Sequence, residues 1–140
     1  MNYLVFLDPY AGELEKILSG VKSVILREFN PARPSTQSVR PGDSLYFLRN
    51  NGDYTLRVRA SVVRVLPVVN ALDEDLSRIL KELQPRLQLI EEQYNYWSAK
   101  TQVLLIEFEF AQKIDGIQLA AEKIKDRSGW IAFDEFSKIT

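Results

Sequence analysis

The chain has 140 residues, of which 46% are hydrophobic and 26% charged, and its formal net charge is −1. This length and composition are typical of one globular domain, which we expect to span residues 1–140. The sequence contains neither cysteine nor histidine, which excludes disulfides, thiol nucleophiles and the usual catalytic triads and disfavours zinc. We therefore expect no metal and no cofactor.

Membrane and export signals are absent from the pattern. No apolar run approaches the ~18–20 residues that span a bilayer. Residues 1–8 lack the basic region and cleavage site of a signal peptide. The expectation is a protein with no membrane partner and, by default, a cytoplasmic location.

Charge is distributed unevenly along the chain. Residues 22–64 contain eight basic and three acidic side chains, a net charge of +5, so the other residues together have −6. A locally positive face would suit an anionic ligand, whereas the acidic remainder argues against strong non-specific DNA binding. The alternative is that the arginines only decorate solvated strand faces.

The first elements follow directly from the N-terminal residues. Residues 3–7 are apolar and predict a strand. Asp8 and Pro9 then fit the N-cap and first position of a helix, and Gly20 is placed to end it.

The remaining elements are predicted from runs of β-branched and aromatic residues, from helical spacing and from turn formers. Strands are expected at 23–29, 44–49, 54–65, 102–110 and 129–133. Turns and loops are expected at 30–38, 41–43 and 50–53. Helices are expected at 72–83, at 87–97 after an interruption at Gln84-Pro85, and at 119–124.

The long strand gives the strongest hint of architecture. Apolar side chains alternate from Leu56 to Val62, and the alternation breaks at residues 63–65, which predicts a bulge or a strand that bends around a barrel. Connections between strands are mostly short turns rather than crossover helices. The sequence therefore predicts an α+β fold, a small mixed or antiparallel β-barrel with flanking helices.

The turn after the first helix resembles the ASCH domain family, a branch of the PUA-like superfamily. The family has a Gly-x-Lys-x-x-Glu-x-Arg motif at this place, and Gly20, Lys22 and Arg27 agree with it, while Ile25 stands at the acidic position. The run 40–43, Arg-Pro-Gly-Asp, is similar to the family's proline-glycine-aspartate turn. The resemblance implies a PUA-like barrel that binds RNA or a nucleotide in a cleft beside it.

Some members of that family are enzymes, including a small amidohydrolase that acts on acetylated cytidine with a lysine, a threonine and a glutamate. The resemblance would place the lysine at Lys22 and the threonine at Ile25, and isoleucine cannot be a nucleophile. The glutamate is expected on the long strand, but residues 54–72 contain no acidic side chain. Ser23 and Ser61 are nearby hydroxyls without an identifiable base, so catalysis is disfavoured but stays open.

Four basic residues are the candidate ligand-binding residues: Lys22, Arg27, Arg57 and Arg59. Lys22 offers a point charge, and Arg27 offers a planar fork for a phosphate or a base edge. A regular strand would put residues five apart on opposite faces. Both can therefore serve one cleft only if the strand bends or if Lys22 still lies in the turn.

The other two arginines alternate along the long strand. Arg57 and Arg59 share a face and would widen the positive rim, with the 30–38 loop covering the cleft. The alternative for Lys22 and Arg27 is that they are solvated at the edge of the sheet, or that they pair with Glu28 or Asp43.

Two further groups of side chains are candidates for a function. Tyr94 and Trp97 fit core positions of a helix, whereas Tyr96 lies off that stripe and is a candidate for stacking on a base. Glu107 and Glu109 alternate along a strand, ~6–7 Å apart, and suggest a hydrolytic pair or a magnesium site. An exposed strand face is the favoured reading of the two carboxylates.

We therefore predict an RNA- or nucleotide-binding domain that catalyses no reaction. The first alternative is a hydrolase, similar to a nucleoside amidohydrolase or a ribonuclease, that uses Lys22 with a hydroxyl or carboxylate from elsewhere. The second is a protein-interaction module that docks a partner on an exposed β edge or on the 30–38 loop. The sequence gives no signal of the oligomeric state.

Overall fold

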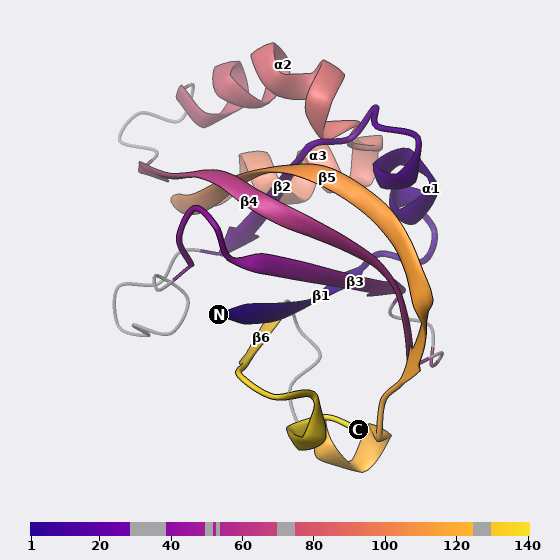
Figure 1. Ribbon diagram of the computed structural model, residues 1–140. Coiled ribbons are helices and arrows are strands. Elements are labelled where there is room, and N and C mark those ends of the chain that lie inside the picture. The colour runs from indigo at the N-terminus through magenta and orange to yellow at the C-terminus, as the bar shows by residue number, and fades with distance from the viewer. Residues whose placement is uncertain (29–38, 50–51, 53, 70–74, 125–129) are drawn as a thin grey trace.

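The computed structural model describes residues 1–28, 39–49, 52, 54–69, 75–124 and 130–140 (Figure 1). Its strands are β1 (Asn2–Leu7), β2 (Val24–Glu28), β3 (Ser44–Arg49), β4 (Thr55–Val69), β5 (Gln102–Gln118) and β6 (Trp130–Phe133). Its helices are α1 (Glu13–Leu18), α2 (Asp75–Leu87) and α3 (Glu91–Ser98), with short 3₁₀ turns η2 (Ala121–Lys123) and η3 (Phe136–Lys138).

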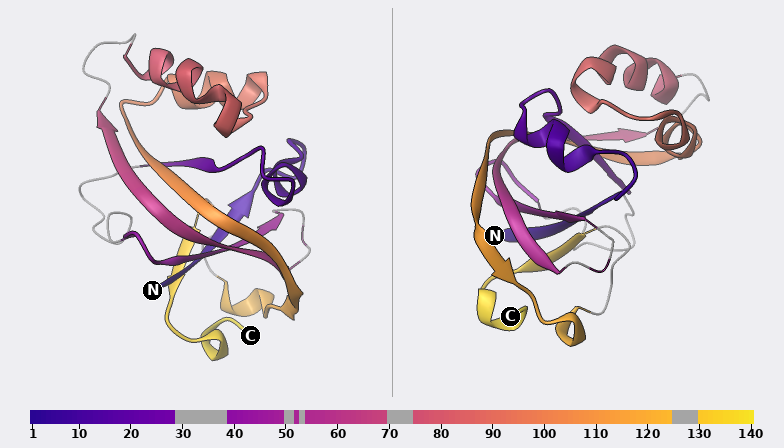
Figure 2. Two further views of the ribbon diagram at one scale, coloured as in Figure 1. Left: turned by 45° about the horizontal axis from the view of Figure 1, so that its top comes forward. Right: turned by 90° about the vertical axis from the view of Figure 1, so that its right-hand side faces the viewer.

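The strands of the described residues form one curled sheet in the order β2-β5-β4-β3-β1-β6. β1 and β3 pair in parallel, and every other neighbouring pair is antiparallel. β4 and β5 are the longest strands and curve along the whole molecule, as both views of Figure 2 show. The result is an α+β half-barrel with flanking helices, so the predicted fold class is confirmed.

The curvature arises where the register of β4 against β5 shifts. Shifts occur between Leu56 and Val58, between Arg59 and Ser61, and between Val62 and Arg64. Each bulge adds residues to one strand only, which bends the pair and increases its twist. The break in alternation predicted at residues 63–65 is therefore a real bulge, and beyond it Val65 rather than Arg64 packs against the barrel core.

Three hydrophobic clusters fill the space around this sheet. The barrel cluster lies on the concave face and includes Val5, Ile17, Ile25, Phe47 and Ile106. A second cluster packs the other face of β1 and β3 against the C-terminal segment, which lies at the bottom of Figure 1. A third lies between the strands β2, β4 and β5 and the helices α2 and α3, which lie at the top.

The first helix begins later than the capping rule predicts. Asp8 and Pro9 lie in a turn, where an Asp8 side-chain oxygen accepts the Tyr10 N–H at 2.8 Å. The helix begins at Glu13 after Gly12, which has φ 63°. The prediction of its end is correct, because Gly20 has φ 85° and its N–H donates to the Ile17 carbonyl at 3.1 Å.

Pro85 does not interrupt the long helix, so that prediction is wrong. α2 continues through Pro85 to Leu87, whose side chain is fully buried together with that of Leu80. Leu80 and Leu87 are seven residues apart and share one helix face, so continuing the helix buries both. This burial offsets the hydrogen bond that the proline cannot donate.

Other boundaries also differ from the predictions. β4 and β5 extend beyond 65 and 110, because the bulges let pairing continue past the breaks in alternation. The predicted loop at 30–38 lies outside the described residues, as does most of the predicted hairpin at 50–53. No helix in the part of the chain that the structure describes is long and apolar enough to cross a membrane.

Candidate ligand-binding site at the α1–β2 turn

Lys22 lies in the turn between α1 and β2, not in the strand. Its N–H donates to the Lys16 carbonyl at 3.0 Å, and the next N–H, of Ser23, donates to the Arg86 carbonyl at 2.9 Å. Both bonds hold the turn against the preceding helix and against the end of α2. The condition that allows Lys22 and Arg27 to serve one site is therefore met, because Lys22 precedes the first strand residue, Val24.

The ammonium group of Lys22 is buried in this turn. Its side chain is 1% exposed, its Nζ donates to the Leu87 carbonyl, and it lies 3.5 Å from Glu13 Oε1. Glu13 Oε2 accepts the Asp8 N–H at 3.0 Å, so both carboxylate oxygens are engaged. A buried lysine thus ties the start of α1 to the C-terminal end of α2.

The C-terminal end of α2 is surrounded by basic groups. Besides Lys22 on the Leu87 carbonyl, Lys16 Nζ donates to the Gln88 carbonyl at 3.2 Å. The end of a helix has unpaired carbonyls and a partial negative charge, which cations complement. Two lysines of the α1 region therefore stabilise the position of α2.

Arg27 closes the barrel beside this cluster. It lies two residues after Ile25 along β2 and so shares the barrel face with it. Its Nη1 donates to the Leu26 carbonyl at 2.7 Å and its Nη2 to the Phe6 carbonyl at 3.2 Å. Since β2 and β1 are not neighbours in the sheet, the guanidinium bridges two separated strands.

The charges of Glu13, Lys22 and Arg27, which together form the cluster at the α1–β2 turn, do not balance. One carboxylate, Glu13, faces two cations, Lys22 and Arg27, which leaves one excess positive charge. Burial lowers the pKa of Lys22 to about 8, against the opposing effect of Glu13, and burial lowers the pKa of Arg27 to about 10. Both pKa values lie above 7, so both side chains are charged at neutral pH.

Arg27 also has an unused donor. Its Nε is buried and, like the Nε of Arg59, has no hydrogen-bond partner among the residues that the structure describes. An unpaired buried donor is costly. The excess charge and the unused donor together make this an environment that favours an anion or a hydrogen-bond acceptor.

Arg57 and Arg59 occupy a different face of the sheet. Val58 and Ala60, which alternate with them along β4, belong to the barrel cluster, so the two arginines point away from it. Arg59 Nη2 donates to Ser44 Oγ at 3.1 Å, and its guanidinium carbon lies 5.9 Å from the centre of the Tyr46 ring. The structure thus brings Lys22 and Arg27 together and places Arg57 and Arg59 elsewhere.

Glu13 is the site residue that the sequence analysis missed. The acidic partners that the alternative interpretation named, Glu28 and Asp43, contact other groups: Glu28 pairs with Lys100 at 2.9 Å, and Asp43 pairs with the N-terminal amine at 3.3 Å. Glu13 precedes Ile17 by four residues, so it lies on the buried face of α1. This four-residue spacing is the feature of the sequence that could have identified Glu13 as a buried residue of the site.

The hydroxyl group next to Lys22 in the sequence, that of Ser23, is bonded to another residue. Ser23 Oγ accepts a hydrogen bond from Arg86 Nε at 3.0 Å. Ile25, at the position where the related amidohydrolase would have a threonine, is 1% exposed within the barrel cluster. Neither residue supplies an activated nucleophile beside the lysine.

The carboxylates on β5 are in unlike surroundings. Glu107 pairs with Arg64 at 3.1 Å and with Arg86 at 2.8 Å, whereas Glu109 is exposed and follows Phe108 on the curved strand. Among the described residues, no three acidic side chains gather closely enough to hold a metal ion.

The aromatic residues of α3 divide as the spacing predicts. Tyr94 and Trp97 pack against the cluster beneath α2 and α3. Tyr96 is 52% exposed, but its hydroxyl donates to Glu28 at 2.9 Å and Lys100 Nζ lies 4.4 Å from the ring centre. Lys100 therefore already covers one face of this ring.

Comparison with solved structures finds the same architecture in an ASCH protein from Zymomonas mobilis. Its structure has a TM-score of 0.71 at 13% identity and covers 96% of this chain and 88% of the other. A serine-to-alanine variant of that protein gives a TM-score of 0.72 at 14% identity, covering 96% and 89%. A tyrosine-to-phenylalanine variant gives 0.71 at 13% identity, covering 96% and 91%.

These similarities extend over nearly the whole chain. They define the class by fold, as an α+β half-barrel with flanking helices. More particularly, the chain has the fold of the ASCH proteins, and the resemblance predicted from the 20–27 motif is confirmed at the level of the fold. No family model matches the sequence, and no curated protein matches it.

Proposed function

We propose that this protein binds RNA or a nucleotide-like ligand through the α1–β2 turn, with Arg27 and Lys22 as the principal binding residues. The observation that supports the proposal most is the cluster of the buried Glu13 and Lys22 with the half-buried Arg27, which has one excess positive charge and one unpaired guanidinium donor. Such a cluster attracts a phosphate or the acceptor edge of a base.

The two cations would have different tasks. Arg27 is half-buried and is therefore the side chain that a ligand meets, while Lys22 is fully buried behind it. In surroundings of low dielectric constant, an interaction between charges is stronger than in water. Lys22 would raise the positive potential at the site without itself being displaced from Glu13.

Arg57 and Arg59 belong to the proposal as a separate contact. Because they lie on the other face of β4, a small ligand held by Arg27 does not reach them. An RNA strand that passes round the sheet would contact both faces. Binding of a mononucleotide should therefore be insensitive to Arg57, whereas binding of a longer RNA should be weakened by its loss.

The test is fluorescence anisotropy with a labelled ten-nucleotide single-stranded RNA at two salt concentrations, followed by competition with a panel of nucleotides and modified nucleosides. Arg27→Gln should weaken binding about tenfold or more, since a charged hydrogen bond contributes roughly 1.5–3 kcal/mol. Arg78→Gln is the matched control, because Arg78 is an exposed arginine on α2. Circular dichroism checks that each variant is folded.

Two results would overturn the proposal. One is a wild-type protein that binds none of these ligands, which would move docking of a protein partner to the front. The other is equal affinity for the RNA in wild type and Arg27→Gln, which would show that binding takes place elsewhere on the molecule.

A hydrolase is the second candidate, and the observation that favours it is the lowered pKa of Lys22, about 8, beside Glu13. A lysine with such a pKa is partly neutral near pH 8 and can accept a proton. Against it, the structure shows no hydroxyl nucleophile bonded to this lysine among the described residues. Turnover of N4-acetylcytidine or cleavage of the RNA, abolished in Lys22→Met, would establish this alternative.

A further inference from the structure

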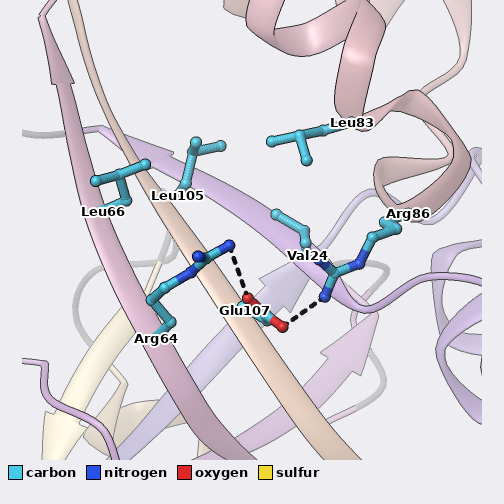
Figure 3. A pocket seen from close by; sticks show the side chains of 7 residues that line it. All are labelled: Val24, Arg64, Leu66, Leu83, Arg86, Leu105 and Glu107. Atoms are coloured by element: carbon cyan, nitrogen blue, oxygen red, sulfur yellow. Dashed lines mark ion pairs between the residues drawn. The ribbon is translucent and has the colours of Figure 1, made fainter.

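A groove lies on the outer side of the sheet, between β4 and β5 and the helix α2 (Figure 3). Leu66 and Leu105 from the two strands and Leu83 from α2 form its apolar part. Arg64, Arg86 and Glu107 form its polar part. The groove thus combines an apolar surface with a charged end.

The charged end is built around one carboxylate. Glu107 Oε2 lies 3.1 Å from Arg64 Nη2, and Glu107 Oε1 lies 2.8 Å from Arg86 Nη2, so Glu107 holds both guanidinium groups (Figure 3). The bulge after Val62 turns Arg64 to this outer side, where it meets Glu107. Two cations against one anion leave an excess charge of +1.

The two arginines differ in how much they can still bind. Arg86 is fixed, because its Nε also donates to Ser23 Oγ at 3.0 Å. The Arg64 side chain is 65% exposed and uses Nη2 for Glu107. Arg64 is therefore the group that can reach an incoming anion, and Arg86 and Glu107 fix the geometry beneath it.

The apolar side of the groove is open to solvent. Leu66 is 48% exposed, so its side chain is accessible to a ligand. A ligand group that covers Leu66 while its anion meets Arg64 would satisfy both parts. A nucleotide unit combines an apolar part with an anion, because its planar base and its sugar adjoin a phosphate.

The groove is joined directly to the α1–β2 site. Arg86 and Leu87 are consecutive: the side chain of Arg86 enters the groove, and the carbonyl of Leu87 accepts the hydrogen bond from Lys22. Ser23, next to Lys22, accepts the hydrogen bond from Arg86. The groove thus adjoins the Lys22 turn, whereas Arg27 lies further along β2 on the concave face.

We propose that this groove is a phosphate subsite for a single-stranded RNA, in which Arg64 binds a backbone phosphate and Leu66 contacts the adjoining sugar or base. The proposal rests on the proposed function, because the RNA would pass from Arg27 on the concave face round the edge strand β2 to the groove on the outer side. A single-stranded RNA has several phosphates, so it can use a second cationic site close to the first. An exposed arginine such as Arg64 suits contact with a backbone phosphate.

The test uses the labelled ten-nucleotide RNA, with affinity measured at several salt concentrations. Arg64→Gln should weaken binding three- to tenfold and make the negative slope of log K against log salt shallower by about 0.7, the effect of one phosphate contact on a single strand. Glu107→Gln removes the negative charge that offsets the two arginines but also replaces one of the two acceptor oxygens by an amide NH2, so it should weaken binding less than Arg64→Gln does. Arg78→Gln, on the same helix as Arg86, is the control for loss of one positive charge.

Uridine monophosphate is the second probe, and it separates the two sources of phosphate. Its binding should depend on Arg27 and not on Arg64. If Arg64→Gln weakens binding of the mononucleotide as much as binding of the RNA, the groove takes a free nucleotide, and its assignment to a single-stranded RNA is wrong.

The remaining outcomes separate this inference from the proposed function. If Arg27→Gln weakens RNA binding but Arg64→Gln and Arg78→Gln bind the RNA with equal affinity, the proposed function stands and the groove subsite is overturned. If Glu107→Gln weakens binding more than Arg64→Gln does, the carboxylate contacts the ligand and the groove does not take a phosphate. If the wild type binds neither probe, both proposals fail together.

Discussion

Replacing Lys22 by methionine should change how the stability of the protein depends on pH. The side chain is 1% exposed, and its pKa is about 8 in the folded protein against its ordinary value of 10.5. Methionine has similar length and no titratable group. The substitution therefore removes one buried titration and leaves the other lysines in place.

The direction follows from proton binding. Between pH 8 and 10.5, the unfolded chain keeps the proton on Lys22 while the folded protein has lost it, so the unfolded state binds more protons. The free energy of unfolding contributed by this group therefore rises with pH in that window and falls as the pH drops through 8. At about 1.4 kcal/mol per pKa unit, the full effect is on the order of 3 kcal/mol, of which about 2 kcal/mol falls between pH 7 and 9.5.

The assay is urea denaturation of the wild type and the variant at pH 7 and pH 9.5. Other groups titrate in both proteins, so the quantity that matters is the difference between them. The wild type should gain about 2 kcal/mol more than Lys22→Met over this interval. Lys81→Met, which removes an exposed lysine of α2, should behave like the wild type. Equal pH dependence in wild type and Lys22→Met would refute the burial of a charged lysine at this position.

Three further substitutions test other parts of the structure by urea denaturation. Glu13→Gln should destabilise the protein by about 3–5 kcal/mol, since it leaves Lys22 buried without its counter-charge, and the double variant with Lys22→Met should lose at least about 0.5 kcal/mol less than the sum of the single variants; strict additivity would mean that the pair does not interact. Phe110 has φ 56° and is 75% exposed, so Phe110→Gly should be about 1 kcal/mol more stable than Phe110→Ala, and the reverse order would show that the strain is absent. Gly42 has φ 94° and open space around its Cα, so Gly42→Ala should cost about 1 kcal/mol from backbone strain alone, and a neutral result would contradict the positive φ.

Local sequence patterns predicted the elements that are set by local chemistry. The strand at 44–49 agrees residue for residue, and the end of α1 at Gly20 follows from the left-handed conformation that glycine adopts easily. The start of α1 was misplaced because Asp8 and Pro9 satisfy a capping rule that the turn at Tyr10 also satisfies. The continuation of α2 past Pro85 depends on burying Leu87, which is a tertiary effect.

The candidate site was predictable in part for the same reason. Motif spacing identified Lys22 and Arg27, and the structure brings them together because Lys22 lies in the turn. The alternation of β4 showed that Arg57 and Arg59 share a face, but only the sheet order shows that this face is turned away from Arg27. The pairing of Arg64 with Glu107 depends on a one-residue bulge, and alternation alone does not reveal its register.

The most direct test of the central claim is an NMR titration of ¹⁵N-labelled protein with uridine monophosphate, in which the perturbed amides locate the ligand. The account predicts that the largest shifts occur at Lys22, Ser23 and Arg27 and at Leu87 at the end of α2, and that they disappear in Arg27→Gln. Shifts confined to the opposite face, around Tyr46 and Arg59, or shifts that persist in Arg27→Gln, would contradict the assignment of the ligand site to the α1–β2 turn.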